Sequence, residues 1–355
     1  MSRYGESDIN WQFEGKAATS QIICGVEVDV TKLIRKVAER TMLWNFRMWG
    51  FGEAVALRGL LKASRTTGDA EPLGYVKGLL RAYAGSGVAR SSEEHVAPGA
   101  ELLLLYEDTG EDILLEAAKR LADLHRSFPV NAHGARLHRC DLPGWRRQIW
   151  VDCMDAEAPF VASLGRITGE ERYFTQAAEE LCAYSKLLQD ENTALFFHGY
   201  EDRCGRNGHF WARGNGWALM GLVETLIALP AGHQRRHELH ERLLALCRGL
   251  AEHQHEDGLW HTVIDHDETY LESTLAVMVA VALQTAFENG LLAQEEFGEC
   301  EKLARSAVFE LIDEDGGLTL VSEATPIGEL KMYATRPMGV FPWGQGPLLL
   351  MLSQS

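Results

Sequence analysis

The sequence lacks the long apolar segments and the basic runs that mark membrane and nucleic-acid-binding proteins. No stretch of its 355 residues approaches the roughly 20 apolar residues that span a bilayer. The N-terminal segment MSRYGESDINWQFEGK also lacks the uninterrupted apolar core of a signal peptide. The chain carries 51 acidic and 34 basic side chains, and its formal net charge of -17 repels phosphate groups. We therefore expect a soluble cytoplasmic protein with neither a membrane nor a nucleic-acid partner.

Recognisable metal-binding patterns are also lacking. The seven cysteines are scattered singly, with neither the paired spacing of a metal site nor the density of a disulfide scaffold. The histidines at positions 253, 255, 261 and 266 have no zinc-binding spacing, and DEDGG at 313–317 lacks the ligand spacing of a calcium loop. We therefore expect no metal ion and no cofactor.

Strand-like alternation is rare, whereas the 3.6-residue period of helices recurs along the chain. We predict about twelve helical segments and an all-α protein. The segments alternate in character. Those such as GNGWALMGLVETLIAL at 214–229 are apolar nearly all round and should be buried, whereas those such as RRHELHERLLALCRGLAEHQ at 235–254 carry a charged face and should lie outside.

Three junctions between an apolar and an amphipathic segment share a Thr-Gly-acid pattern, at 67–69, 109–111 and 168–170. The glycine suits a left-handed helix end, and the acid suits the positive first turn of the next helix. Helical pairs that repeat in this way bury their apolar faces by stacking. We predict an (α/α)6 barrel of six inner and six outer helices. It should form one catalytic domain over residues 31–355, preceded by an N-terminal extension over residues 1–30.

The inner helices of such a barrel run parallel, so their N-termini should meet at one end and form a mouth. The conspicuous residues precede or begin these helices: Trp49, Glu94, Trp150, Asp152, Trp211, Arg213, Glu272 and Trp343. Free backbone N–H groups at helix N-termini also favour an anionic ligand group. Tryptophan usually packs in a core, but four tryptophans at one mouth favour stacking against sugar rings.

Asp152 and Arg213 are the candidates for chemistry at this mouth. Position alone favours a helix-capping role for Asp152. Its neighbours Trp150 and Cys153 would keep its carboxyl group partly from water, which favours a proton donor active at neutral pH. Arg213 is compatible with either a structural ion pair or a clamp on a substrate carboxylate. Asp155, one turn further on, is expected to be a solvated or capping acid.

The element HFWARGNGW at 209–217, with WVDCMDAEAPF at 150–160 before it, resembles the unsaturated rhamnogalacturonyl hydrolases of glycoside hydrolase family 105. The resemblance extends over most of the chain, from WGFGEAVALRGLL to WGQGPLLLML. It implies the same (α/α)6 barrel and identifies Asp152, in its W-x-D context, with the family's catalytic acid.

Further residues match family positions that line the sugar site: Trp150, His198, Trp211 and Arg213. Without the resemblance, His198 in its polar loop would be expected to be solvated. Glu94 aligns with a position where the family often has Asp, and Leu275 stands where a Gly is common.

The resemblance implies removal of a terminal 4,5-unsaturated uronic acid from small lyase-generated oligosaccharides, of the rhamnogalacturonan type found in pectin. The reaction would be a hydration of the C4=C5 enol ether. Several alternatives stay open: an unsaturated glucuronyl hydrolase acting on glycosaminoglycan fragments, an ordinary glycosidase or sugar epimerase on the same fold, and a non-catalytic glycan-binding relative.

Overall fold

The computed structural model describes residues 20–23, 26–46, 50–86, 96–140 and 142–354, and it is predominantly helical. The helices are α1 (Val30–Met42), α2 (Phe51–Thr67), α3 (Ala70–Ser86), α4 (Gly99–Thr109), α5 (Asp112–Arg126), α6 (Cys153–Ala156), α7 (Ala158–Thr168), α8 (Glu171–Leu188), α9 (Ala212–Ala228), α10 (Arg236–Glu252), α11 (Ser273–Glu288), α12 (Gln294–Glu310), α13 (Leu330–Ala334) and α14 (Pro342–Leu352). Each of the twelve predicted segments is present. The sixth is divided into α6 and α7, because Pro159 in the first turn of α7 has no N–H to continue the helix of α6.

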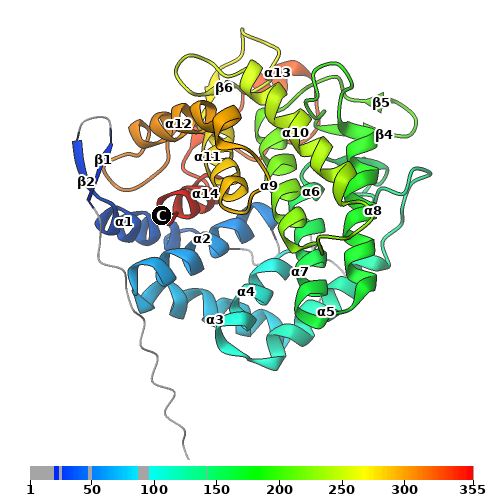
Figure 1. Cartoon of the computed structure of the whole chain (residues 1–355), viewed down its shortest axis with the longest axis horizontal. Helices are drawn as coiled ribbons and strands as arrows, with labels where there is room; N and C mark the ends of the chain where they lie inside the picture. The colour runs from blue at the N-terminus through cyan, green and yellow to red at the C-terminus, as the bar shows by residue number, and fades with distance from the viewer. Residues whose placement is uncertain (1–19, 24–25, 47–49, 87–95, 141, 355) are drawn as a thin grey trace, which may run out of the picture.

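The helices form two concentric rings (Figure 1). The inner ring consists of α2, α4, α7, α9, α11 and α14, in which each helix packs against the next and α14 packs back against α2. The outer ring consists of α1, α3, α5, α8, α10 and α12, each paired with an inner helix. The predicted (α/α)6 barrel is therefore confirmed.

The alternation of apolar and amphipathic segments explains the two rings. Nearly all side chains of α9 and α11 are buried, because these helices have neighbours on every side. Outer helix α5 instead buries one stripe, which includes Leu114, Ala117 and Leu121 at helical spacing. Among the described helices, none combines the length and the apolar character that crossing a lipid bilayer demands. The apolar faces of the inner helices are covered by other helices.

The three Thr-Gly-acid junctions end α2, α4 and α7 as predicted. Gly68, Gly110 and Gly169 occupy the C-cap positions with φ values of 70°, 66° and 74°. This left-handed conformation strains residues that carry a Cβ atom. The chain can therefore reverse within two or three residues, and α3, α5 and α8 follow at once.

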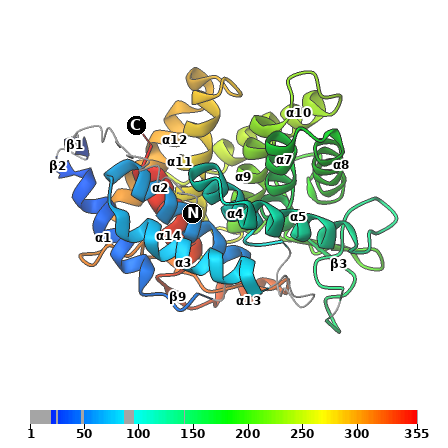
Figure 2. The ribbon, with the colours of Figure 1, turned by 90° about the horizontal axis from the view of Figure 1, so that it is seen from below.

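Short strands were not predicted. The first two precede the outer helix α1, and the others stand in the segments that lead into inner helices. The strands are β1 (Ser20–Ile23), β2 (Val26–Asp29), β3 (Gln148–Trp150), β4 (Gly199–Glu201), β5 (Gly205–Arg206), β6 (Trp260–His261), β7 (Leu271–Glu272), β8 (Val321–Ser322) and β9 (Met338–Gly339). All pairings are antiparallel, in the orders β1-β2, β3-β4-β5, β6-β7 and β8-β9. Figure 2 shows β3, β9 and α13 along the same side of the rings. β3 places Trp150 opposite Gly199, and β7 places Glu272 opposite Trp260.

Candidate active site

A cavity of about 620 Å³ lies at the end of the barrel where inner helices begin. Five residues predicted for the mouth line it together: Trp150, Asp152, Trp211, Arg213 and Trp343. Its other lining residues come from the start of α2, from α9 and from loops: Trp44, Asn45, Gly50, Gly52, Glu53, His138, Trp145, Trp217, Glu323, Ala324, Thr325, Pro326 and Phe341. Trp49 and Glu94 lie outside the described residues. Sequence reasoning thus located the cavity but missed much of its lining.

Two groups of stacked rings line this cavity. The ring of Trp150 stacks on His138, with centroids 4.2 Å apart and planes 13° from parallel, and Trp145 lies 5.1 Å from Trp150. Phe341 and Trp343 form the second group, with centroids 4.9 Å apart and planes 5° from parallel. Flat apolar faces of this kind suit the C–H side of a sugar ring. Spacing in the sequence gave no signal for His138 or Trp145, which belong to a long loop.

Asp152 lies between β3 and α6, where pairing with the next strand fixes the backbone. The N–H of Val151 donates to the carbonyl of His198 at 3.0 Å. Asp152 lines the cavity but is only 2% exposed, in agreement with the burial predicted from its apolar neighbours. It occupies the N-cap position of α6, but its side chain makes no capping hydrogen bond. The capping alternative therefore does not account for this carboxyl group.

His198 lies directly behind Asp152. Its Nε2 atom is 3.5 Å from Oδ2 of Asp152, and its Nδ1 atom is 2.7 Å from the hydroxyl oxygen of Tyr333. Burial lowers the pKa of His198, and the neighbouring Asp152 offsets this only in part, so the ring is neutral at pH 7. The expectation of a solvated histidine is wrong, because the polar segment around it folds as the β4–β5 hairpin and packs against α13. His198 does not itself line the cavity, but it contacts Asp152, which does.

Arg213, near the start of α9, is buried and already bonded on both terminal nitrogens. Nη1 donates to Glu272 at 2.9 Å and to the carbonyl and hydroxyl oxygens of Ser322 at 2.9 and 2.8 Å. Nη2 donates to the Glu323 carbonyl at 2.9 Å and to the Thr325 hydroxyl at 3.3 Å. The structural ion pair is therefore the alternative that the geometry supports. Among the described residues no acceptor faces the Nε–H group of Arg213. The side chain can therefore offer a ligand this single N–H group, but not a bidentate contact.

The remaining residues of the ARGNGW element hold α9 in place. Asn215 bonds both backbone groups of Phe196 at 2.7 and 2.9 Å, which anchors the strand-like segment leading to His198. A Cβ atom at Gly214 would lie 2.6 Å from Val151, and one at Gly216 would lie 2.4 Å from Met278. These glycines therefore allow close packing of protein against protein. The glycines of HFWARGNGW could also have let the backbone approach a sugar, but the structure gives Gly214 and Gly216 this packing role instead.

Asp155 was expected to be a solvated or capping acid, and the structure shows that this expectation is wrong. It is 4% exposed and pairs with Arg58 of α2, whose Nη2 lies 3.6 Å from Oδ2. Arg58 also bonds Glu101 of α4 at 3.2 Å and Glu224 of α9 at 2.7 Å. Burial raises the pKa of Asp155 to about 7, against the opposing effect of Arg58. Periodicity did not reveal this role, because the partner lies on a different inner helix.

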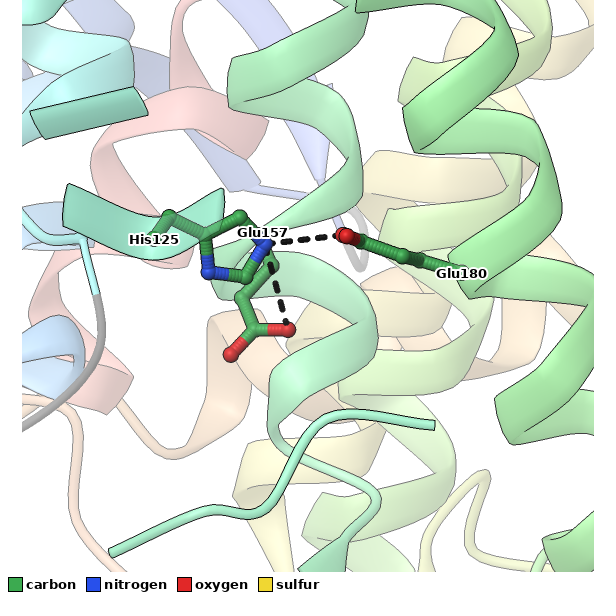
Figure 3. Close-up of side chains that lie close together, drawn as sticks. All are labelled: His125, Glu157 and Glu180. Carbon is green, nitrogen blue, oxygen red and sulfur yellow. Dashed lines mark hydrogen bonds and ion pairs between the residues drawn. The ribbon is translucent and has the colours of Figure 1, made fainter. Parts of the chain in front are cut away.

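Another buried group of ionisable side chains lies where α5, α7 and α8 meet (Figure 3). Nε2 of His125 is 2.8 Å from Oε2 of Glu180 and 3.9 Å from Oε2 of Glu157. The three side chains each offer one possible metal-ligating atom within 4.8 Å of the others. Arg136 also donates to Glu180 at 2.6 Å, and the Tyr184 hydroxyl donates to Glu157 at 2.5 Å. These contacts describe a cluster of ion pairs in which the carboxylates already have cationic or hydroxyl donors.

Comparison with known proteins relates this chain to enzymes that act on carbohydrates. The sequence model of Glycosyl Hydrolase Family 88 matches residues 29–355. The chain is 27% identical over 338 residues to the unsaturated rhamnogalacturonyl hydrolase YesR of Bacillus subtilis, an alignment that covers 92% of this chain and 95% of that protein. The resemblance inferred from HFWARGNGW is thus confirmed over nearly the whole chain.

Solved structures show the same fold. A possible member of the GH105 family from Klebsiella pneumoniae aligns with a TM-score of 0.84 and 24% identity, over 97% of both chains. The unsaturated glucuronyl hydrolase of Bacillus sp. GL1 aligns with a TM-score of 0.72 and 15% identity, over 90% of this chain and 94% of that one.

Proposed function

Because the chain belongs to Glycosyl Hydrolase Family 88, we propose that it removes a terminal 4,5-unsaturated uronic acid from small lyase-generated oligosaccharides. The observation that carries this proposal is the buried carboxyl group of Asp152 in an aromatic-lined cavity that also contains Arg213. Such a cavity offers flat faces for sugar rings, one acid for proton transfer and a cation near a uronate.

The reaction is a hydration of the C4=C5 enol ether. Asp152 donates its proton to C4, and positive charge develops at C5 and the ring oxygen. The carboxylate that results accepts a proton from the water that attacks C5, and the hemiketal opens with release of the remaining sugar. One carboxyl group thus serves first as acid and then as base, so no second carboxylate at the spacing of ordinary glycosidases is required.

The cavity supplies binding groups for each part of the substrate. Trp150, Trp211 and Trp343 form walls against the sugar rings. The uronate carboxylate lies near Nε–H of Arg213, and near the N-terminus of α2, where Gly50 lines the cavity and no side chain caps the helix. Trp49 and Glu94 belong to the same site in this proposal, as a further wall and a hydroxyl partner.

We favour a substrate of the rhamnogalacturonan type, and with it a role in pectin degradation. YesR, the relative aligned over nearly the full chain, carries the name of an unsaturated rhamnogalacturonyl hydrolase. A cytoplasmic location is part of the proposal. None of the six described cysteines belongs to a disulfide, as a reducing compartment allows.

An absorbance assay tests this function, because hydration destroys the conjugated double bond. Purified protein should bleach the ultraviolet absorbance of an unsaturated rhamnogalacturonan disaccharide faster than that of an unsaturated chondroitin disaccharide. The reverse preference would favour a glucuronyl hydrolase. Hydrolysis of saturated substrates alone would indicate an ordinary glycosidase, and binding without bleaching would indicate a non-catalytic protein.

A further inference from the structure

A directed series of hydrogen bonds runs from Asn207 through Tyr333 to His198, whose Nε2 atom faces Asp152. The backbone N–H of Gly199 donates to Oδ1 of Asn207 at 3.1 Å. This contact fixes the orientation of the amide, since a backbone N–H requires an acceptor. Nδ2 of Asn207 is therefore the atom that faces Tyr333, and it donates to the hydroxyl oxygen of Tyr333 at 3.1 Å.

The hydroxyl group of Tyr333 is fully constrained by its neighbours. Tyr333 is buried, and its oxygen accepts from Asn207 and, at 3.4 Å, from the backbone N–H of Gly328. A hydroxyl oxygen has two lone pairs and one hydrogen. With both lone pairs directed at donors, its hydrogen must point to the third neighbour, Nδ1 of His198 at 2.7 Å.

We propose that Tyr333, oriented by Asn207, fixes His198 in the tautomer that carries its hydrogen on Nε2, which then faces Oδ2 of Asp152. Nδ1 accepts the tyrosine hydrogen and so carries none of its own. The neutral ring must then be protonated on Nε2, the atom 3.5 Å from the carboxyl oxygen. Tyr333 and Asn207 are positioning residues, and they extend the hydrolase mechanism on which this inference rests.

The tautomer determines which oxygen of Asp152 is available to the substrate. The oxygen of a carboxyl group that carries no hydrogen is the better acceptor for an N–H directed at Oδ2, so the transferable proton is favoured on Oδ1. With the opposite tautomer, Nε2 would accept, and the proton of Asp152 would be drawn toward the histidine and away from C4. Oδ2 of Asp152 and Nε2 of His198 are both buried, and neither has another hydrogen-bond partner among the described residues, so the two atoms face each other at 3.5 Å.

The surroundings of His198 keep the ring in this position. Its centroid lies 4.3 Å from the ring of Trp211 and 5.3 Å from that of Trp150. Arg213 is the cation nearby and disfavours a second proton on the ring, as does burial. The remaining freedom of His198 is the choice between two tautomers, and Tyr333 makes that choice.

The tautomer can be observed directly by NMR of protein labelled with ¹⁵N-histidine, with His198 identified by the loss of its signals in His198→Gln. The wild type should show hydrogen on Nε2. Tyr333→Phe should give a mixture of tautomers, and Asn207→Asp should invert the tautomer, because a carboxylate would accept the tyrosine hydrogen. A wild-type ring with hydrogen on Nδ1 would overturn the proposal, whether or not the substrate has been found.

Kinetics supply the second readout. Tyr333→Phe should lower kcat by roughly 10-fold, a part of what acid–base catalysis contributes, with little change in KM. Asn207→Asp should lower kcat at least as much. Tyr173→Phe, which removes a buried tyrosine hydroxyl of α8 that contacts Arg172, is the matched control and should leave kcat unchanged.

A double variant separates positioning from general support of the structure. In His198→Phe the ring carries no nitrogen atom, so no tautomer remains for Tyr333 to fix. Adding Tyr333→Phe to this variant should therefore change its kcat less than twofold. A further 10-fold loss in that background would mean that Tyr333 acts by packing, and the proposal would fail. Absence of turnover in every protein, with the expected NMR result, would reject the hydrolase function and leave the tautomer assignment standing.

Discussion

Arg213 and Glu272 form a buried ion pair that joins the starts of α9 and α11, with Nη1 2.9 Å from Oε1. The second oxygen of Glu272 accepts from the hydroxyl groups of Thr262 at 2.9 Å and Ser322 at 3.0 Å. Ser322 also bonds Arg213. The pair therefore fixes two inner helices and the loop at 323–326 that lines the cavity.

Glu272→Gln should destabilise the protein by about 3 kcal/mol, because it leaves the buried guanidinium without a compensating charge. Urea unfolding at neutral pH measures this change. Glu268→Gln, at a neighbouring carboxyl group with an exposed side chain, should change stability little. Equal stability of Glu272→Gln and the wild type would show that the ion pair contributes no net stabilisation.

Asp152→Asn should reduce turnover of an unsaturated disaccharide by roughly 10²-fold or more, because the amide cannot donate the required proton. Loss of ultraviolet absorbance gives the rate. Asp155→Asn is the matched control, since Asp155 is buried one turn further on and its carboxyl pairs with Arg58. Comparable losses in the two variants would deny Asp152 a specific role in catalysis.

Gly221→Ala should destabilise the protein by about 1–3 kcal/mol, through overpacking of α9 against α6. The added Cβ would lie 2.2 Å from the carbonyl oxygen of Met154, two residues beyond Asp152, so kcat should fall as well. Gly78→Ala in α3 is the control. Its Cβ would meet no atom within 4 Å, so we expect a gain of about 0.5–1 kcal/mol. Thermal and urea unfolding should show a loss of stability for Gly221→Ala and a gain for Gly78→Ala.

The stability of the protein should depend on pH through His125. Burial lowers the pKa of this histidine, but Glu180 and Glu157 outweigh burial and raise it above its ordinary value of 6.5. A folded-state pKa above the unfolded one gives stability that is complete below pH 6.5 and is lost as the pH rises through the higher value.

His125→Gln should therefore cost more unfolding free energy at pH 6 than at pH 9, measured by urea unfolding at each pH. His237→Gln, at an exposed position on α10, is the control. The difference between its unfolding free energies at pH 6 and pH 9 should equal that of the wild type. A cost for His125→Gln that grows with pH would contradict the raised pKa.

The helices and their ends were predictable because the signals are local. Apolar periodicity distinguished the inner helices from the outer ones. The three-residue Thr-Gly-acid pattern was enough to predict left-handed C-caps at Gly68, Gly110 and Gly169. Parallel inner helices then placed Asp152 and Arg213 in one cavity. Each of these steps needs only the period of a helix and the topology of a ring.

The hydrogen-bond partners of the site were not predictable in the same way. Tyr333 lies 135 positions from His198, and Glu272 lies 59 positions from Arg213. Both pairings depend on short strands and loops whose course is set by tertiary packing. Asp155 was misjudged for a similar reason, since its partner Arg58 belongs to another helix.

Closure of the inner ring has a consequence for biosynthesis. α2 packs against α14, and the approach is close enough that a Cβ at Gly59 would lie 2.6 Å from the carbonyl oxygen of Gly346. On the ribosome, α2 emerges long before α14 is translated, so its apolar surface stays uncovered while most of the polypeptide is synthesised. The nascent chain therefore exposes apolar surface of α2 that chaperones can bind. Trp343, which belongs to α14, takes its place in the cavity only after nearly the whole chain has been synthesised.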